Sequence, residues 1–142
     1  MRTNKLALVI IFTIILGLSI SYGQCNTDPI AEKVAAKLGD FTFLKSYKID
    51  GTKNNVVEYS YVFSKDTQYL LIYGDATDET AKVLVTLYDG SRKELASNYD
   101  KKNNRYLPGI GYRCTATGIY YMTFSLKDSE EKCGVGVLGF KK

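Results

Sequence analysis

Histidine and tryptophan are both absent from this sequence of 142 residues. Without histidine, the chain cannot form a Ser-His-Asp or Cys-His catalytic group or a metal site with imidazole ligands. Without tryptophan, it lacks the aromatic side chain best suited to binding sugars and cations. These absences exclude many hydrolase mechanisms and leave carboxylates, tyrosines and cationic side chains as the groups with which the protein can act.

An excess of charge of one sign is also missing. Lys and Arg total 19 and Asp and Glu total 15, which gives a formal net charge of +4. Removal of Arg2 and Lys5 with a leader peptide would lower that value by two. Proteins that bind nucleic acid normally carry a concentrated basic face, so we expect no nucleic-acid partner.

Residues 1–23 have the form of an export signal. Arg2 and Lys5 precede an apolar run over 6–20, and small residues lead up to a cleavage point after Gly23. The apolar run is shorter than the roughly 20 residues that span a bilayer. We therefore expect signal-peptide cleavage and no transmembrane segment in the mature chain.

The mature chain would comprise residues 24–142, which suffices for one domain and leaves no room for a second. We expect this domain to be secreted, periplasmic or on the cell surface. The alternative is a lipoprotein acylated at Cys25, although Gln24 is a poor residue before such a cysteine and Tyr22 is bulky where an aliphatic residue is usual.

A single segment, 29–38, has the apolar period of a helix. Asp28 can cap it, Pro29 suits its first turn, and Gly39 can end it in a left-handed conformation. Its apolar stripe consists of Ile30, Val34 and Leu38. We expect this helix to pack against a sheet edge or one end of the fold.

After the helix, the apolar period changes from 3.6 residues to two, which indicates strands. The predicted strands are 41–49, 57–63, 68–73, 82–88, 94–98, 110–116, 119–126 and 133–140. Eight short strands separated by turn signals predict an all-β fold, an antiparallel β-sandwich of the jelly-roll kind with one short N-terminal helix. Gly118–Phe124 is apolar on both faces, which predicts a central strand covered from both sides.

The last predicted strand contains Gly134, Gly136 and Gly139. Glycine normally weakens a strand interior and often marks a place of close approach. We expect these glycines to admit bulky side chains such as Phe124, with a site where ligand meets bare backbone as the alternative.

Several of these segments resemble the bacterial pre-peptidase C-terminal domain. They also resemble small secreted proteins of Bacteroidetes that share a Cys, Gly-Ile-Tyr-Tyr, Cys-Gly pattern. The segments are 61–63, 69–72, 85–89, 95–98 and 118–123. The resemblance covers residues 56–140 and implies a β-sandwich jelly roll, which in that family is usually an accessory module of exported hydrolases.

Three cysteines in an exported chain permit one disulfide and leave one cysteine over. We predict the pair Cys114–Cys133, because both residues are expected in strands that flank the central strand. Closing so short a loop stabilises a fold by roughly 3 kcal/mol in the chain-entropy model. Cys25 would then be free, joined to another chain, or paired in place of one of the others.

A polar loop offers a possible calcium site. It contains Asp75, Asp78 and Glu79, followed by the hydroxyl of Thr80. Calcium takes 6 to 8 oxygen ligands, and the sequence has no dense loop motif such as an EF-hand. A solvated acidic loop is the simpler interpretation, and no other cofactor is expected.

Residues 99–107 interrupt the strand pattern with a charged excursion, which we expect to be an exposed loop. Its candidate ligand-binding residues are Tyr99, Lys101, Lys102, Arg105 and Tyr106. Two tyrosines beside three cations suit a sugar or an anionic surface. The strand tyrosines are expected mainly to fill the core or form cross-strand pairs, since strands favour aromatic residues.

Together these features predict a non-catalytic binding module that acts at the cell envelope or outside the cell, with a glycan or an envelope protein as its partner. One alternative is a glycoside hydrolase that uses Glu58 with Asp89 or Glu94 as its paired carboxylates. Another is a structural component of an envelope assembly, suggested by an unpaired Cys25. The sequence does not indicate an oligomeric state.

Overall fold

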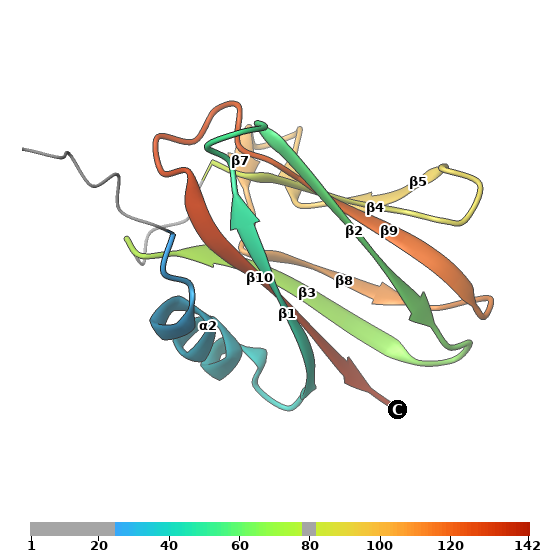
Figure 1. Cartoon of the computed structure of the whole chain (residues 1–142). Helices are drawn as coiled ribbons and strands as arrows, with labels where there is room; N and C mark the ends of the chain where they lie inside the picture. The colour runs from blue at the N-terminus through green and yellow to red at the C-terminus, as the bar shows by residue number, and fades with distance from the viewer. Residues whose placement is uncertain (1–24, 78–81) are drawn as a thin grey trace, which may run out of the picture.

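The computed structural model describes residues 25–77 and 82–142 (Figure 1). The predicted export signal therefore lies outside the described residues, as do Asp78 and Glu79 of the possible calcium site. The helix α2 (Asp28–Ala35) continues into a short 3-10 turn, η1 (Ala36–Leu38). The strands that follow in the described chain are β1 (Thr42–Asp50), β2 (Val56–Phe63), β3 (Gln68–Asp75), β4 (Leu84–Tyr88), β5 (Glu94–Ser97), β6 (Tyr99–Asp100), β7 (Arg105–Tyr106), β8 (Gly109–Arg113), β9 (Gly118–Ser125) and β10 (Cys133–Lys141).

The longer strands form two antiparallel four-stranded sheets that pack against each other (Figure 1). The first sheet has the order β1-β10-β3-β8, and the second has the order β2-β9-β4-β5. The pairs are nested along the chain, because β4 pairs with β5, β3 with β8, β2 with β9 and β1 with β10. This nesting is the connectivity of a jelly roll, and it confirms the predicted fold class.

The core lies between the two sheets and is filled by alternate residues of each strand. In β9, Tyr120, Met122 and Phe124 are buried. The residues between them point outward, and Ile119 is 51% exposed. β9 is indeed an interior strand, between β2 and β4, but the prediction that both of its faces are covered is wrong, because the outer face of the second sheet meets solvent.

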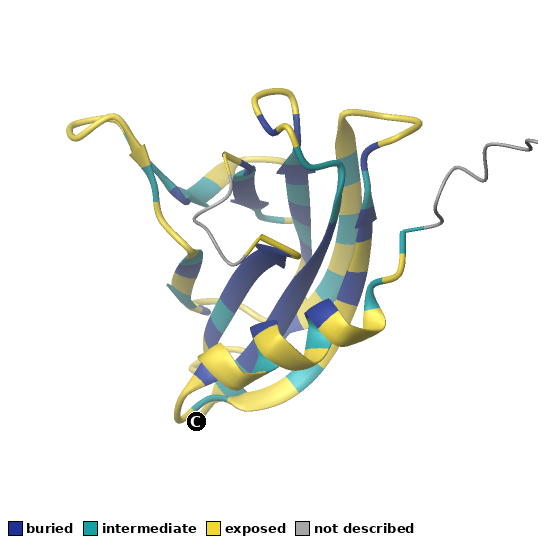
Figure 2. Cartoon of the chain, turned by 90° about the vertical axis from the view of Figure 1, so that its left-hand side faces the viewer, coloured by how far each residue is buried: buried dark blue, intermediate teal, exposed yellow. Residues whose placement is uncertain are grey.

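The outer face of the first sheet is covered by α2, which runs alongside that sheet in Figure 2. Ile30, Val34 and Leu38 are buried there in one cluster with Val135 and Val137. The helix therefore packs on a sheet face and not on an edge or end of the sandwich as predicted. None of the helices within the described residues is long and apolar enough to cross a membrane.

Both ends of the helix differ from the prediction. The N-cap position is Thr27, which makes no side-chain capping bond, and Asp28 is already the first helical residue. Gly39 follows the 3-10 turn with φ of 61° and ψ of −119°; glycine reaches positive φ without steric cost, but this is not the left-handed helical conformation that was predicted.

The glycines of β10 serve packing, as predicted. A Cβ atom at Gly136 would lie 2.6 Å from Cζ of Phe124, across the core. A Cβ atom at Gly134 would lie 2.2 Å from the hydroxyl of Tyr73. The bare backbone of β10 is therefore already covered at these two positions by aromatic side chains, Phe124 from the opposite sheet and Tyr73 from the neighbouring strand β3.

The disulfide joins Cys25 to Cys133, with their Cα atoms 5.5 Å apart, so the predicted pair Cys114–Cys133 is wrong. Cys114 follows β8 and is a free thiol, only 1% exposed. β3 separates β8 from β10, and its two ends pair with Arg113 and Gly134 respectively. Cys114 and Cys133 thus lie at opposite ends of the sheet, roughly 25 Å apart at the rise of a strand, whereas bridged Cα atoms lie within about 7 Å.

The bridge also bears on the lipoprotein alternative. The acyl group of a lipoprotein is carried on the sulfur of its first cysteine. Because the sulfur of Cys25 is bonded to that of Cys133, acylation and this disulfide are mutually exclusive. The structure therefore argues against acylation of Cys25.

Candidate functional site

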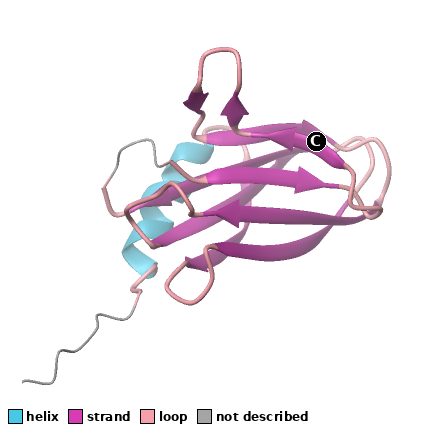
Figure 3. Ribbon diagram, turned by 90° about the horizontal axis from the view of Figure 1, so that it is seen from above, coloured by secondary structure: helices cyan, strands magenta, loops and turns pink. Residues whose placement is uncertain are grey.

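A hairpin arm, residues 99–106, projects from the body of the sandwich (Figure 3). It consists of β6 and β7, which pair with each other and with neither main sheet. The tip residues 101–105 are all exposed. The charged excursion predicted from the sequence is thus an ordered ribbon and not an irregular loop.

The root of the arm is fastened by a buried asparagine, Asn98, which is 2% exposed. Its Oδ1 accepts a hydrogen bond from the backbone N–H of Val85 at 2.8 Å, and its Nδ2 donates to the carbonyls of Val83 at 2.9 Å and Leu107 at 3.0 Å. The backbone N–H of Leu107 donates in turn to the carbonyl of Asn98 at 2.7 Å. Both ends of the arm are therefore held to β4 and its approach by satisfied, buried hydrogen bonds.

The tip of the arm is held by Asp100. Its Oδ1 accepts hydrogen bonds from the backbone N–H groups of Lys102 at 3.1 Å and Asn103 at 3.2 Å, and its Oδ2 accepts one from Nδ2 of Asn103 at 2.7 Å. The side-chain bond from Asn103 is the main cause of a lowered pKa for Asp100. Asn104 completes the turn in a left-handed conformation, with φ of 50°. The arm is consequently preformed at both root and tip.

Tyr99 and Tyr106 stand opposite each other in the ribbon, with ring centroids 5.0 Å apart and ring planes at 53°. The hydroxyl of Tyr99 donates to Oδ1 of Asn104. The hydroxyl of Tyr106 donates to Oδ2 of Asp128, in the β9–β10 loop, at 3.1 Å. Burial, and next this hydrogen bond, raise the pKa of Tyr106. These contacts fix both rings in place.

Beside the tyrosine pair lies an open depression of about 1050 Å³. Its lining residues are Lys82, Tyr99, Asn104, Arg105, Tyr106, Leu107, Pro108 and Asp128. They combine the apolar surfaces of two rings, a leucine and a proline with cations, an amide and a carboxylate. Such a mixture of apolar contact area and a few polar groups is typical of a ligand site.

The structure brings three of the five predicted binding residues, Tyr99, Arg105 and Tyr106, to this depression. Lys101 and Lys102 lie at the exposed tip of the arm and are not among its lining residues. The sequence analysis missed Lys82 and Asp128, which reach the site only through the folding of distant segments. It also missed Asn98, which was treated simply as the end of a strand.

The possible calcium site receives no support from the described residues. Asp75 is 5% exposed, and its Oδ1 accepts hydrogen bonds from the backbone N–H of Thr77 at 2.9 Å and from its hydroxyl at 2.5 Å. Asp78 and Glu79 lie outside the described residues. Within residues 25–77 and 82–142, no group of three or more His, Cys, Asp or Glu side chains gathers as metal ligands would.

Two of the three carboxylates proposed for a glycoside hydrolase, Glu58 and Asp89, have structural partners, whereas Glu94 is exposed. Glu58 forms an ion pair with Arg92 at 2.6 Å, and the Arg92 guanidinium lies over the ring of Tyr121, 3.6 Å from its centroid. Oδ1 of Asp89 accepts hydrogen bonds from the N–H groups of Ser91 and Lys93 at 2.9 and 3.0 Å, and from the hydroxyl of Ser91 at 2.7 Å. Asp89 therefore holds the β4–β5 turn together.

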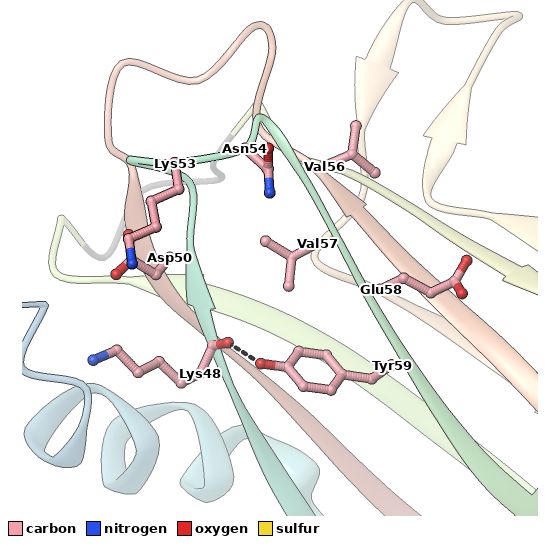
Figure 4. Close-up of a pocket in the computed structure, with 8 residues that line it drawn as sticks. All are labelled: Lys48, Asp50, Lys53, Asn54, Val56, Val57, Glu58 and Tyr59. Atoms are coloured by element: carbon pink, nitrogen blue, oxygen red, sulfur yellow. Dashed lines mark hydrogen bonds between the residues drawn. The ribbon is translucent and has the colours of Figure 1, made fainter.

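A second, smaller depression of about 440 Å³ lies where β1 and β2, the edges of the two sheets, face each other (Figure 4). The hydroxyl of Tyr59 donates to the carbonyl of Lys48 at 2.5 Å and links the two sheets there. Asp50 and Glu58 both line this depression, but Figure 4 shows the carboxyl of Glu58 pointing away from Asp50. The arrangement offers no facing pair of carboxyl groups.

Most strand tyrosines belong to the core, as expected. Tyr69, Tyr73 and Tyr120 are buried, and other tyrosines pack against them. Phe63 stacks between Tyr69 and Tyr120, with centroid separations of 3.9 and 4.8 Å. The tyrosines at the arm differ from these core tyrosines, because they are half buried and line the larger of the two depressions.

A scan against models of known protein families found no match to this chain, and a search of curated proteins found no relative. The resemblance to the pre-peptidase C-terminal domain therefore stays a prediction.

Proposed function

We propose that this protein is a secreted, non-catalytic binding module and that it binds a glycan at the arm and the adjoining depression. One observation carries this proposal: a preformed arm holds the rings of Tyr99 and Tyr106 beside an open depression lined by polar side chains. Aromatic rings offer flat apolar surface for the C–H faces of a sugar, while polar neighbours can bond its hydroxyls.

The order of the arm supports a binding role. Binding by a flexible loop loses affinity because the loop has to be ordered, at about 0.5 to 1.5 kcal/mol for each immobilised side chain. Here the hydrogen bonds of Asn98, Asp100 and the two tyrosines already fix the arm. That cost is therefore largely met during folding.

The cysteines support an extracellular location. Disulfides form and persist mainly in oxidising compartments, and the Cys25–Cys133 bridge agrees with the predicted export signal. The third cysteine, Cys114, is buried. With Cys25 already paired, the feature that suggested covalent linkage in an envelope assembly is removed.

The experiment is a glycan array probed with the purified mature chain, residues 24–142, followed by titration of each bound glycan. We expect Tyr106→Ala to weaken binding about tenfold or more, as truncation of a central aromatic contact typically does. Tyr106→Phe should retain most of the affinity, because it keeps the ring and loses only the bond to Asp128. Tyr88→Ala, on the outer face of the second sheet, is the matched control.

If no glycan binds, the proposed ligand class is wrong. If binding occurs but Tyr106→Ala and Tyr88→Ala behave alike, the depression is not the site. Thermal unfolding of each variant separates a loss of contact from a loss of folding.

A further inference from the structure

We infer that the depression selects an acidic saccharide, one that carries carboxylate or sulfate groups, over a neutral one. This inference rests on the function proposed above and adds the chemical class of the ligand. It follows from the hydrogen-bonding capacity of the residues around the depression.

Several acceptor groups of the site are already engaged. Oδ1 of Asn104 receives the hydroxyl of Tyr99, and Oδ2 of Asp128 receives the hydroxyl of Tyr106. The carboxylate of Asp100 accepts hydrogen bonds at the tip of the arm. The acceptors left to a ligand are the other carboxylate oxygen of Asp128 and the hydroxyl oxygens of the two tyrosines.

The donor groups are far less engaged. Arg105 meets Asp100 through Nε, at 3.6 Å, and within the described residues its terminal nitrogens form no ion pair. Lys82 also lines the depression, and among the described residues no carboxylate forms an ion pair with it. Lysine carries three donors and arginine five, and neither has an acceptor.

This imbalance between donors and acceptors favours a ligand rich in acceptors. Hydrogen bonds from a cation to an anionic oxygen are about twice as strong as those between neutral groups. Lys101 and Lys102, at the exposed tip of the arm, add positive potential and have no ion-pair partner in the described chain. The rings of Tyr99 and Tyr106 would contact the sugar while Lys82 and Arg105 bind its acidic group.

The test is calorimetric titration of the mature chain with matched polysaccharides. Polygalacturonate is compared with its fully methyl-esterified form, and dextran sulfate with dextran. We expect each acidic polymer to bind at least about tenfold more tightly than its neutral match at about 0.05 M NaCl, and the difference to shrink at about 0.5 M, where screening is strong. The two acidic polymers distinguish carboxylate from sulfate as the preferred group.

The variants Lys82→Gln and Arg105→Gln test the residues. We expect each to weaken binding of the acidic polymer about fivefold, the upper range for an exposed ion pair, and to weaken binding of a neutral glycan less, because a glutamine can still donate to a sugar hydroxyl. Lys82→Arg keeps the charge and should keep the affinity. Lys37→Gln, on the far side of the first sheet, is the matched control for a general loss of positive charge.

Equal affinity for acidic and neutral polymers would overturn the inference and leave glycan binding intact. If Lys37→Gln weakens binding of the acidic polymers as much as Lys82→Gln does, the inference is overturned too, because the positive charge of the whole surface and not the depression would then attract the polymer. Absence of binding both to these polymers and across the glycan array would refute the proposed function itself.

Discussion

Removal of the Cys25–Cys133 bridge should lower the free energy of unfolding substantially. The bridge joins residues with a sequence separation of 108. In the chain-entropy model, a closed loop of that size stabilises the folded state by about 4.7 kcal/mol, by restricting the unfolded chain. A domain of this size is stable by roughly 5 to 15 kcal/mol in total. We therefore expect Cys25→Ala to remove between a third and nearly all of the stability.

The assay is urea unfolding of the oxidised chain, with the free energy extrapolated to zero denaturant. Cys114→Ala is the matched variant, because it removes a cysteine and leaves the bridge. It should cost only about 1 kcal/mol, for the lost contacts of a small buried side chain. A thiol titration of the unfolded chains should find two thiols in Cys25→Ala and none in Cys114→Ala.

A loss below about 1 kcal/mol in Cys25→Ala would refute the reasoning on loop closure. Two free thiols in unfolded Cys114→Ala would refute the pairing of Cys25 with Cys133 itself. The second result would also remove the argument that Cys25 is unavailable for acylation.

Three further predictions concern the core and the turns. Asn98→Ala should lower the free energy of unfolding by about 2 to 3 kcal/mol, because buried backbone groups lose their partners, and proteolysis should then cut the arm at rates that the wild-type chain does not show. Gly136→Ala should cost about 1 to 3 kcal/mol through overpacking against Phe124; an unchanged urea midpoint would contradict the close packing. Hydrogen bonds within the turns, chiefly from Ser91 and Asn103, lower the pKa values of Asp89 and Asp100. The two ionised carboxylates therefore stabilise the folded state above the ordinary pKa of 3.8, and this stabilisation is lost as pH falls through the folded pKa. The melting temperature should therefore fall between pH 6 and about pH 2, and Asp89→Asn with Asp100→Asn should reduce that fall; an identical fall would contradict the assignment.

Local patterns predicted the strands because the signal is itself local. Side chains alternate between the two faces of a strand, so Val57–Phe63 and Ile119–Leu126 carry their burial pattern in consecutive residues. The observed β2 and β9 agree with those ranges to within one residue at each end. Strands of two residues, such as β6 and β7, carry no such pattern, and the arm was accordingly predicted only as an exposed loop.

The cysteine pairing failed for a reason of topology. Spacing along the chain placed Cys114 and Cys133 on either side of the same strand, β9. The nested connectivity instead sends β8 and β10 to the other sheet, with β3 between them. Pairing depends on which sheet each strand joins and on its direction there, and neither is written in residue spacing.

In the candidate site too, residues close together in the sequence were predictable, and residues brought together by folding were not. Tyr99, Arg105 and Tyr106 were predictable because they lie within one polar excursion between two apolar strands. Lys82 and Asp128 lie at other positions along the chain and meet the arm only in the folded protein. Asn98 was predicted only as the last residue of a strand, since burial of its side chain depends on the packing of β4 beside it.

The position of the arm within the fold is the last argument for assigning function to it. The arm lies on the connection from β5, at the edge of the second sheet, to β8, at the edge of the first. A connection that only crosses between sheets needs few residues, and each ordered residue costs about 1 to 2 kcal/mol of backbone entropy. In this connection, the buried side chain of Asn98 instead holds an eight-residue ribbon that belongs to neither main sheet. The ribbon adds little to the core, so packing does not offset the entropy lost in ordering it. We therefore expect the role of the ribbon to be the contact that Tyr99 and Tyr106 make with a ligand.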